Sequence, residues 1–211
     1  MHILVTAGPT QEPIDPVRYL ANRSSGKQGF AIAAALAAQG ARVTLIAGPV
    51  TLETPPGVTR IDVQTAREMA AAVEAALPAD AAIMVAAVAD WRVDSVGQKI
   101  KKDGSGPPTL TLVENPDILA ELARSPQRPR LLIGFAAETE NVIANATAKR
   151  ARKGCDWIVA NNVSGDVMGG EANTVHLVTA GEVESWQRLA KHEVARKLAA
   201  KIGEALESGR E

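Results

Sequence analysis

The chain has 211 residues, of which 46% are hydrophobic and 22% charged, and its formal net charge is −1 at pH 7. This length and composition are those of an ordinary globular protein with one sizeable core, and they exclude an intrinsically disordered chain. The near-neutral charge argues against a general nucleic-acid-binding protein, in which basic residues are in excess. We therefore expect no nucleic-acid partner.

The cysteine content and hydropathy restrict the cellular compartment. The one cysteine, Cys155, excludes an internal disulfide and fits the reducing cytoplasm. No apolar run approaches the length of a membrane span, and no signal peptide precedes the first strand, so we expect a cytoplasmic protein without a membrane partner. The abrupt start on a core strand is typical of a domain taken from a longer chain.

Short apolar runs alternate with helical patterns, as in a sheet connected by crossover helices. The expected strands cover residues 2–7, 42–47, 81–89, 109–113, 131–137 and 157–160, and strands over 174–179 and 183–187 form an edge hairpin. The expected helices cover residues 26–39, 65–77, 140–153 and 189–207, with a short one beginning near 115. We predict one Rossmann-like, doubly wound α/β domain over residues 1–211, with a mostly parallel sheet and a long insertion after the first strand.

Small polar residues mark the expected helix ends. Ser24 and Ser25 are suitable N-caps for the first helix, and Gly40 is a suitable C′ residue at its end. Thr65 is the expected N-cap of the second helix. Asn115 is the expected cap of the short helix because Pro116 then falls at its first position.

Two long loops are expected to have a function beyond connecting the neighbouring strands and helices. The first lies within residues 8–30; its inserted part, residues 9–27, contains three prolines and two arginines and ends in Ser-Ser-Gly-Lys. The second, over residues 90–108, contains Lys99, Lys101 and Lys102. Three ammonium groups so close together repel one another unless a polyanion lies between them, and a triphosphate fits. The alternative is an ordinary solvated surface.

Known phosphate motifs match the first loop poorly. Gly26-Lys27 suggests a P-loop, but Gln28 replaces the required Ser or Thr and Ala21 replaces the first glycine. The insertion also separates Gly8 from Gly26 and Gly29, which breaks the dinucleotide fingerprint. A glycine turn and a helix start beside Lys27 nevertheless suit an anion. The alternative is a capped helix with a solvated lysine.

An oxidoreductase is weakly supported. The acidic residue that holds the ribose of NAD is missing, since Ala47-Gly48-Pro49 stands at the end of the second strand. The Tyr-x-x-x-Lys pair of short-chain dehydrogenases is absent too, because Arg23 follows Tyr19 at that spacing. Asp90 and Asp117 follow strands and could orient a nucleotide or hold Mg²⁺ through water, although Asp117 could equally be a helix cap. The sequence has no Cys/His metal cluster and no readable nucleophile–base arrangement.

Seven ordered motifs together resemble the phosphopantothenate–cysteine ligase (phosphopantothenoylcysteine synthetase) family, in its bacterial form. They are Thr6-Ala7-Gly8-Pro9-Thr10, Asp15-Pro16-Val17-Arg18-Tyr19, Asn22-Arg23-Ser24-Ser25-Gly26-Lys27, Ala86-Ala87-Val88-Ala89-Asp90, Lys99-Ile100-Lys101-Lys102, Asn115-Pro116-Asp117-Ile118 and Gly134-Phe135-Ala136-Ala137-Glu138-Thr139. The resemblance extends over essentially the whole chain. It implies a two-step ligation in which phosphopantothenate and CTP form an acyl-cytidylate, from which the cysteine amine displaces CMP.

The resemblance also implies functional residues. The family's essential asparagine and loop lysine correspond to Asn22 and Lys99, as catalytic residues. Nucleotide contacts correspond to Met84, Val85, Ala86, Asp90, Lys99, Pro116, Asp117, Ile118, Leu119, Phe135, Lys149 and Lys153. Phosphopantothenate contacts correspond to Gly8, Asn22, Ser24, Ser25, Gly26, Lys27 and Gly29.

Family membership carries further expectations. Mg²⁺ or Mn²⁺ acts with CTP as co-substrate, no flavin is expected on this domain, and the metal ligands are unknown. The protein is expected to be a homodimer, fused to or associated with a phosphopantothenoylcysteine decarboxylase domain. This chain departs from the family at Asn161-Asn162 and Met168-Gly169-Gly170, where Asn-Asp and Gly-Phe are common. A Rossmann-type NAD(P)- or flavin-binding oxidoreductase and a non-catalytic nucleotide sensor are the alternatives.

Overall fold

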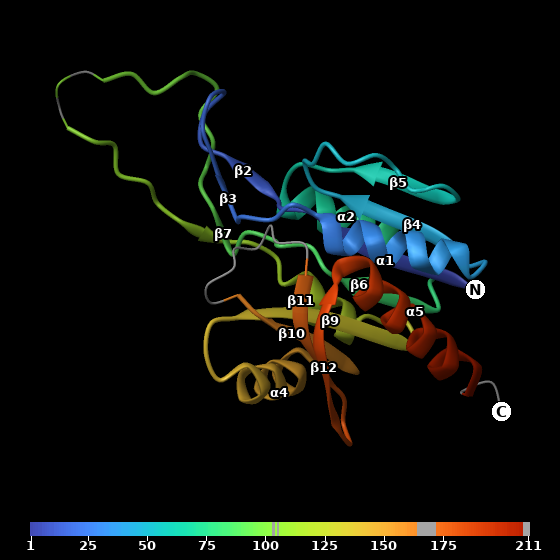
Figure 1. The fold of residues 1–211 in the computed structure, drawn as a ribbon. Helices are drawn as coiled ribbons and strands as arrows, with labels where there is room; N and C mark the ends of the chain where they lie inside the picture. The colour runs from blue at the N-terminus through green and yellow to red at the C-terminus, as the bar shows by residue number, and fades with distance from the viewer. Residues whose placement is uncertain (103, 105, 164–171, 209–211) are drawn as a thin grey trace.

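The fold is organised around one eight-stranded sheet (Figure 1). The computed structural model describes residues 1–102, 104, 106–163 and 172–208; Met168-Gly169-Gly170 lie outside them. The sheet order is β12-β11-β10-β9-β6-β1-β4-β5. Its strands are β1 (His2–Ala7), β4 (Arg42–Ala47), β5 (Val58–Asp62), β6 (Ala81–Met84), β9 (Leu131–Glu138), β10 (Trp157–Asn162), β11 (Ala172–Val178) and β12 (Val183–Ala190).

The strand directions confirm the predicted Rossmann-like class. Six strands from β5 to β10 pair in parallel, in the order of a doubly wound nucleotide-binding fold. The β11 and β12 strands form the expected antiparallel hairpin at one edge. The strand order reverses between β1 and β6, which is the point at which such sheets bind ligands.

Helices cover both faces of the sheet. The α1 (Lys27–Ala38) and α5 (Lys191–Ser208) helices pack on one face, and α2 (Ala66–Ala75), α3 (Ile118–Arg124) and α4 (Val142–Lys153) pack on the other. Alternate strand residues supply the two cores, because successive side chains point to opposite faces. In β1, for example, Ile3 and Val5 face α1 whereas Leu4 faces α2. No helix in the described ranges is long and apolar enough to span a membrane.

The helix ends confirm some predicted caps and correct others. Thr65 caps α2 through a capping box with Glu68, and Gly40 adopts a left-handed φ of 83° after α1. The predicted caps Ser24 and Ser25 are wrong, since the N-cap of α1 is Gly26 and no side chain caps it. The predicted cap Asn115 is also wrong. The α3 helix begins after Asp117, whose carboxylate accepts a hydrogen bond from the backbone N–H of Ala120.

The predicted strand over 81–89 is too long, because regular pairing ends at Met84. Beyond it, three backbone N–H groups bond to the end of β1 and to the first loop instead: Ala86 donates to Thr6 Oγ1, Ala87 to the carbonyl of Gly8 and Ala89 to Thr10 Oγ1. This apolar stretch therefore lies along the first loop instead of extending the sheet.

The two long loops form an arm that projects from the body (Figure 1). The first contains an unpredicted hairpin of β2 (Gln11–Pro13) and β3 (Tyr19–Ala21). The second leaves and returns through β7 (Trp91–Arg92) and β8 (Val113–Glu114). The predicted strand over 109–113 is thereby reduced to this short pair. At its base, the Glu12 carboxylate accepts a hydrogen bond from the N–H of Ala66 at the start of α2, 2.8 Å away.

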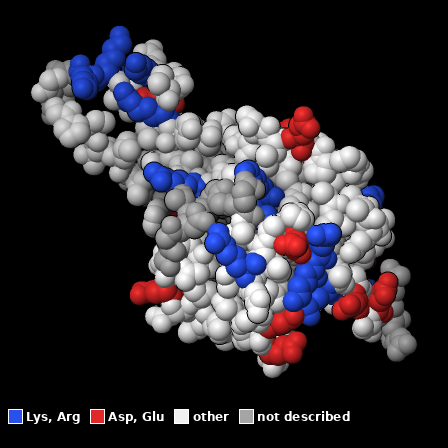
Figure 2. Space-filling model, viewed as in Figure 1, with Lys and Arg blue, Asp and Glu red and all other residues white. Residues whose placement is uncertain are grey.

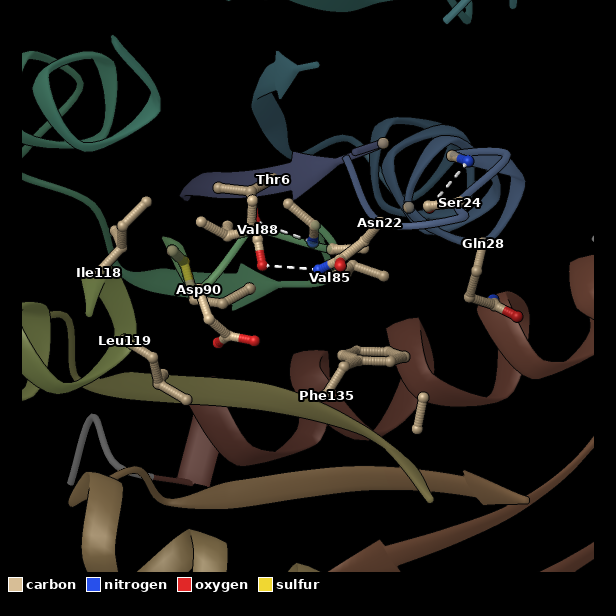
Figure 3. A pocket seen from close by; sticks show the side chains of 18 of the residues that line it. Thr6, Asn22, Ser24, Gln28, Val85, Val88, Asp90, Ile118, Leu119 and Phe135 are labelled. Carbon is tan, nitrogen blue, oxygen red and sulfur yellow. Dashed lines mark hydrogen bonds between the residues drawn. The ribbon is translucent and has the colours of Figure 1, made fainter. Parts of the chain in front are cut away.

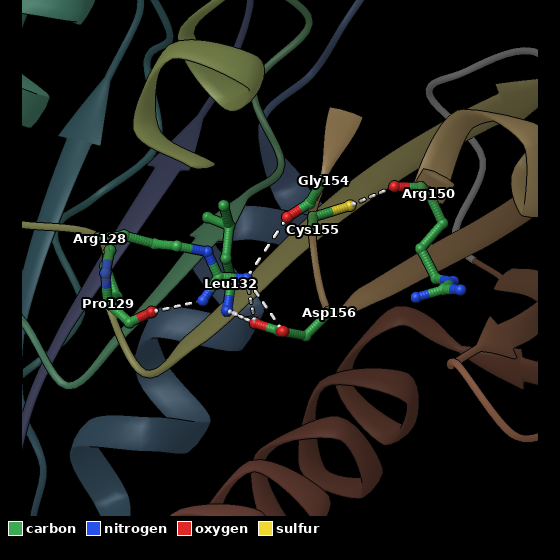
Figure 4. Close-up of polar contacts among 7 residues, drawn as sticks. All are labelled: Arg128, Pro129, Leu132, Arg150, Gly154, Cys155 and Asp156. Atoms are coloured by element: carbon green, nitrogen blue, oxygen red, sulfur yellow. Dashed lines mark hydrogen bonds and ion pairs between the residues drawn. The ribbon is translucent and has the colours of Figure 1, made fainter. Parts of the chain in front are cut away.

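A cluster of polar side chains joins the amino ends of β9 and β10 (Figure 4). Arg128 forms an ion pair with Asp156 at 2.9 Å. The second oxygen of Asp156 accepts a hydrogen bond from the N–H of Leu132 at 2.7 Å. Cys155 beside it is buried, and burial raises the pKa of its thiol. These contacts join two strands far from the switch point and so serve the fold.

Candidate active site

A pocket of about 790 Å³ opens at the carboxyl ends of β1, β6 and β9. The long first loop and the start of α1 form one wall, and α3 and α4 contribute the opposite one. The pocket thus lies at the switch point of the sheet, where a doubly wound fold binds its ligands.

The pocket collects every predicted site residue except one. The residues assigned to phosphopantothenate all line it: Gly8, Asn22, Ser24, Ser25, Gly26, Lys27 and Gly29. So do the assigned nucleotide contacts Met84, Val85, Ala86, Asp90, Pro116, Asp117, Ile118, Leu119, Phe135, Lys149 and Lys153. The exception is Lys99, which is on the arm and does not line this pocket. The individual binding and catalytic roles stay predictions.

Close backbone contacts shape the wall at the start of α1. Gly8 and Gly26 both have left-handed φ angles, 79° and 73°, which favour glycine. A Cβ on Gly26 would lie 3.4 Å from the Cα of Gly8, and a Cβ on Gly29 would lie 2.5 Å from the Cβ of Ala7. The glycines therefore let the first turn of α1 approach β1. Because no side chain caps this turn, its N–H groups and helix dipole suit an anion.

Asn22 lies in the pocket between the wall at the start of α1 and the opposite wall (Figure 3). Its side-chain amide donates a hydrogen bond to the carbonyl of Val88 at 2.9 Å. Thr6, at the end of β1, accepts one from the N–H of Ala86 at 3.2 Å. These bonds tie the segment after β6 to the end of β1 and to the first loop, and the bond to Val88 fixes the orientation of the Asn22 amide.

The opposite wall holds two lysines one turn apart on α4, as their spacing predicted. Lys149 donates a hydrogen bond to the carbonyl of Phe135 at 2.8 Å, and burial lowers the pKa of its ammonium group. Lys153 forms an ion pair with Asp117. Burial opposes ionisation of the Asp117 carboxyl, but the hydrogen bonds from Lys153 and Ala120 lower its pKa below the usual value. This wall presents positive charge to a ligand.

Three carboxylates line the pocket: Asp90, Glu114 and Asp117. Across the described residues, no group of three or more His, Cys, Asp or Glu side chains could hold a metal ion. Mg²⁺ commonly binds through one or two carboxylates together with substrate phosphates. The pocket is therefore compatible with a metal that arrives on a polyphosphate, and either Asp90 or Asp117 could hold it through water.

Sequence reasoning missed several lining residues, including Thr6, Gln28 and Lys191. Lys191 begins α5 and is only 8% exposed, and its carbonyl accepts a hydrogen bond from the side chain of Gln28 at 3.1 Å. The position of Thr6 at the carboxyl end of a predicted strand could have indicated its role. Nothing in the local sequence marks Lys191, because tertiary packing alone brings α5 beside α1.

Comparisons with known proteins show which family and fold this chain resembles. The family model described as the DNA/pantothenate metabolism flavoprotein C-terminal domain matches residues 1–206. The coenzyme A biosynthesis bifunctional protein CoaBC of Escherichia coli (strain K12) is 51% identical over 183 residues, 84% of this chain and 45% of that protein. Its Haemophilus influenzae counterpart is 46% identical over 205 residues, 96% of this chain and 51% of that protein.

The chain thus spans about half the length of the curated relatives that it matches. By contrast, the alignment with the crystal structure of the C-terminal domain of a CoaBC protein covers nearly all of both chains. That domain is 40% identical, with a TM-score of 0.84, and the alignment covers 98% of this chain and 96% of that domain.

Proposed function

Because this chain belongs to the family of DNA/pantothenate metabolism flavoprotein C-terminal domains, we propose that it is a phosphopantothenate–cysteine ligase. It condenses 4′-phosphopantothenate with L-cysteine through an acyl-cytidylate, a step of coenzyme A biosynthesis. The observation that carries the proposal is the pocket itself, in which an uncapped helix start, the Asn22 amide and a wall with Lys149 and Lys153 face one space. Such a space suits a phosphorylated acid on one side and a nucleotide on the other.

In the first step, a carboxylate oxygen of phosphopantothenate attacks the α-phosphorus of CTP. The P–O bond to the β-phosphate breaks, and pyrophosphate leaves. The start of α1 holds the distal phosphate of phosphopantothenate, since first-turn N–H groups bind anions. Lys149 and Lys153 take the nucleotide, and Lys99 closes on the triphosphate, which opposes the charge that develops on the leaving group.

In the second step, the amine of cysteine attacks the acyl carbon. A C–N bond forms, the C–O bond to CMP breaks, and the amine loses a proton to solvent. The Asn22 amide, fixed by its bond to Val88, offers a hydrogen-bond donor to the oxygen that becomes negative. This assignment gives Asn22 a role mainly in amide formation.

Mg²⁺ or Mn²⁺ is the proposed metal, carried into the pocket on CTP. Asp90 and Asp117 are the residues proposed to hold it, through water. When bound, the metal neutralises charge on the triphosphate. The residues do not distinguish CTP from ATP by themselves, and the choice of CTP follows the bacterial family.

The proposed assembly is a cytoplasmic homodimer, fused to or associated with a phosphopantothenoylcysteine decarboxylase domain. Support for a second copy comes from the arm, which carries exposed apolar side chains at Val17, Tyr19, Trp91, Leu110 and Leu112. Several exposed apolar side chains on one projecting segment are typical of an interaction surface.

The test is pyrophosphate release from CTP, Mg²⁺ and phosphopantothenate in the absence of cysteine. We expect pyrophosphate to form and CMP to appear only after cysteine is added. No pyrophosphate would overturn the ligase proposal. Nucleotide binding without pyrophosphate release would instead indicate a nucleotide sensor. Tight binding of NAD(P) without any thermal shift by CTP would favour the oxidoreductase.

A further inference from the structure

Asp15 is a buried carboxylate far along the arm and outside the pocket lining. It is 4% exposed, although the surrounding turn is largely open to solvent. Its Oδ1 accepts hydrogen bonds from the N–H groups of Val17 and Arg18, at 2.8 and 2.9 Å. These two bonds close the turn between β2 and β3, which is a common local use of aspartate.

The second oxygen of Asp15 makes contacts that the turn itself does not require. Oδ2 accepts a hydrogen bond from the N–H of Ile100, 85 residues away, at 3.2 Å. It also forms an ion pair with Arg18 at 2.9 Å, and that guanidinium donates to the carbonyl of Ile100 at 3.3 Å. Both polar groups of Ile100 are thus held by the turn of the first loop.

Ile100 lies within the basic cluster, between Lys99 and Lys101. Figure 2 shows positive side chains gathered on the projecting arm. One further contact joins the loops nearby, a hydrogen bond from the N–H of Val96 to the carbonyl of Ile14 at 3.1 Å. The Lys99–Lys102 segment therefore rests on the first loop, and Asp15 is its central acceptor.

We propose that Asp15 is a positioning residue that holds the Lys99–Lys102 segment on the β2–β3 hairpin, so that the two loops present Lys99 to the nucleotide as one arm. The nucleotide part of this inference rests on the proposed function. Asp15 itself touches no reacting group, and its effect passes through the backbone of Ile100. Burial opposes ionisation of Asp15, but the hydrogen bonds from Val17, Ile100 and Arg18 lower its pKa.

Asp15→Asn separates the role of the side chain in the turn from its contacts with Ile100 and the Arg18 guanidinium. With its oxygen on the turn, the new amide presents an NH₂ group to the N–H of Ile100 and to Arg18, where no hydrogen bond can form. Asp94→Asn is the matched control, because Asp94 lies exposed on the second loop and its replacement makes the same change in charge. Amide hydrogen exchange at Ile100 reports the contact directly.

We expect Asp15→Asn to speed this exchange at least about tenfold, whereas Asp94→Asn leaves it unchanged. We also expect the KM for CTP to rise about tenfold with a smaller change in kcat. Combining Asp15→Asn with Lys99→Gln should raise the KM for CTP little more than either variant alone, because both variants act through Lys99. Unchanged exchange at Ile100, or effects of Asp15→Asn and Lys99→Gln that simply multiply, would overturn the proposal. If the wild-type protein releases no pyrophosphate, the ligase assignment fails, while the exchange rate still decides whether Asp15 holds the segment.

Discussion

The side-chain amide of Asn22 donates a hydrogen bond to the carbonyl of Val88, which joins the end of the first loop to the segment after β6. The bond uses one N–H of the amide. The second N–H and the carbonyl oxygen remain available to a ligand in the pocket, since an amide group has two donors and one acceptor atom. The same side chain can therefore be held by the fold and act on a substrate.

Asn22→Ala should separate the two half-reactions of the proposed ligase. Pyrophosphate release from CTP and phosphopantothenate should continue, whereas transfer of the acyl group to cysteine falls about 10²-fold or more, because a donor to the developing oxyanion is lost. Rapid-quench measurement of pyrophosphate and CMP separates the steps. Asn145→Ala, on α4 outside the pocket lining, is the control. Normal transfer to cysteine by Asn22→Ala would show that the assigned role is wrong.

Gly29→Ala should destabilise the protein by about 1–3 kcal/mol, because the added Cβ lies 2.5 Å from the Cβ of Ala7 and the backbone of β1 cannot easily move. Gly203→Ala is a matched control in a helix. Nothing lies within 4 Å of its Cβ, and we expect a gain of about 0.5–1 kcal/mol. Denaturant unfolding measures both. Equal stabilities of the two variants would contradict this account of the pocket wall.

The sequence predicted the parallel core well, because short continuous apolar runs rich in β-branched residues are typical of strands that are buried on both faces. It failed where tertiary contacts override that pattern. The apolar run after Met84 favours a strand, yet its N–H groups bond to Thr6 at the end of β1 and to Gly8 and Thr10 in the first loop, about 80 residues earlier. The unpredicted edge strand β5 shows the same limit, because Arg60 is held by the carbonyl of Leu52 and by the ring of Phe30.

The candidate site was predicted mainly through its motifs, and the geometry explains why local reasoning was insufficient. The position of Gly26 as the N-cap of α1 cannot be read from residue types, which favour Ser24 and Ser25 as caps. The approach of Lys149 to Phe135 depends on how α4 packs beside β9. Lys99 was grouped with these residues by resemblance, whereas the arm carries it outside the pocket lining.

Lys149→Met should weaken CTP binding without lowering stability. Burial depresses the pKa of Lys149, so its protonated form disfavours the folded state at neutral pH. Removing the charge should therefore leave the free energy of unfolding equal or higher, while loss of a charged hydrogen bond reduces CTP affinity about tenfold. Arg152→Met, exposed on the same helix, removes the same charge outside the pocket and should bind CTP normally. Calorimetric titration and thermal unfolding measure the two effects, and unchanged CTP affinity in Lys149→Met would contradict the nucleotide assignment.

Leu112→Glu should convert the proposed dimer to a monomer. Leu112 is 51% exposed on the arm, close in sequence to Leu110 and Val113, which are also exposed. A charge buried without a partner in an apolar interface is unfavourable. Ile143→Glu on α4, at a site 42% exposed, is the control and should leave the assembly unchanged. Sedimentation velocity measures the state, and a dimeric Leu112→Glu variant would remove the arm from the interface.

Glu184→Gln should reduce stability at neutral pH but not in acid. Its carboxylate lies between Lys201 and Lys197, at 2.7 and 3.1 Å, and the bonds from these lysines, chiefly from Lys201, lower its pKa from 4.5 to about 2. Because the folded-state pKa is below the unfolded one, the ion pairs stabilise the fold above pH 4.5, and this contribution is lost as the pH falls toward about 2. The site is on the surface, so we expect a loss of only about 0.5 kcal/mol near neutral pH. Denaturant unfolding from neutral to acid pH should show the curves of the wild type and Glu184→Gln converging, whereas Glu207→Gln, elsewhere on α5, shows no such loss. A stability difference that persists below the folded-state pKa would mean that Glu184 acts through packing rather than through its charge.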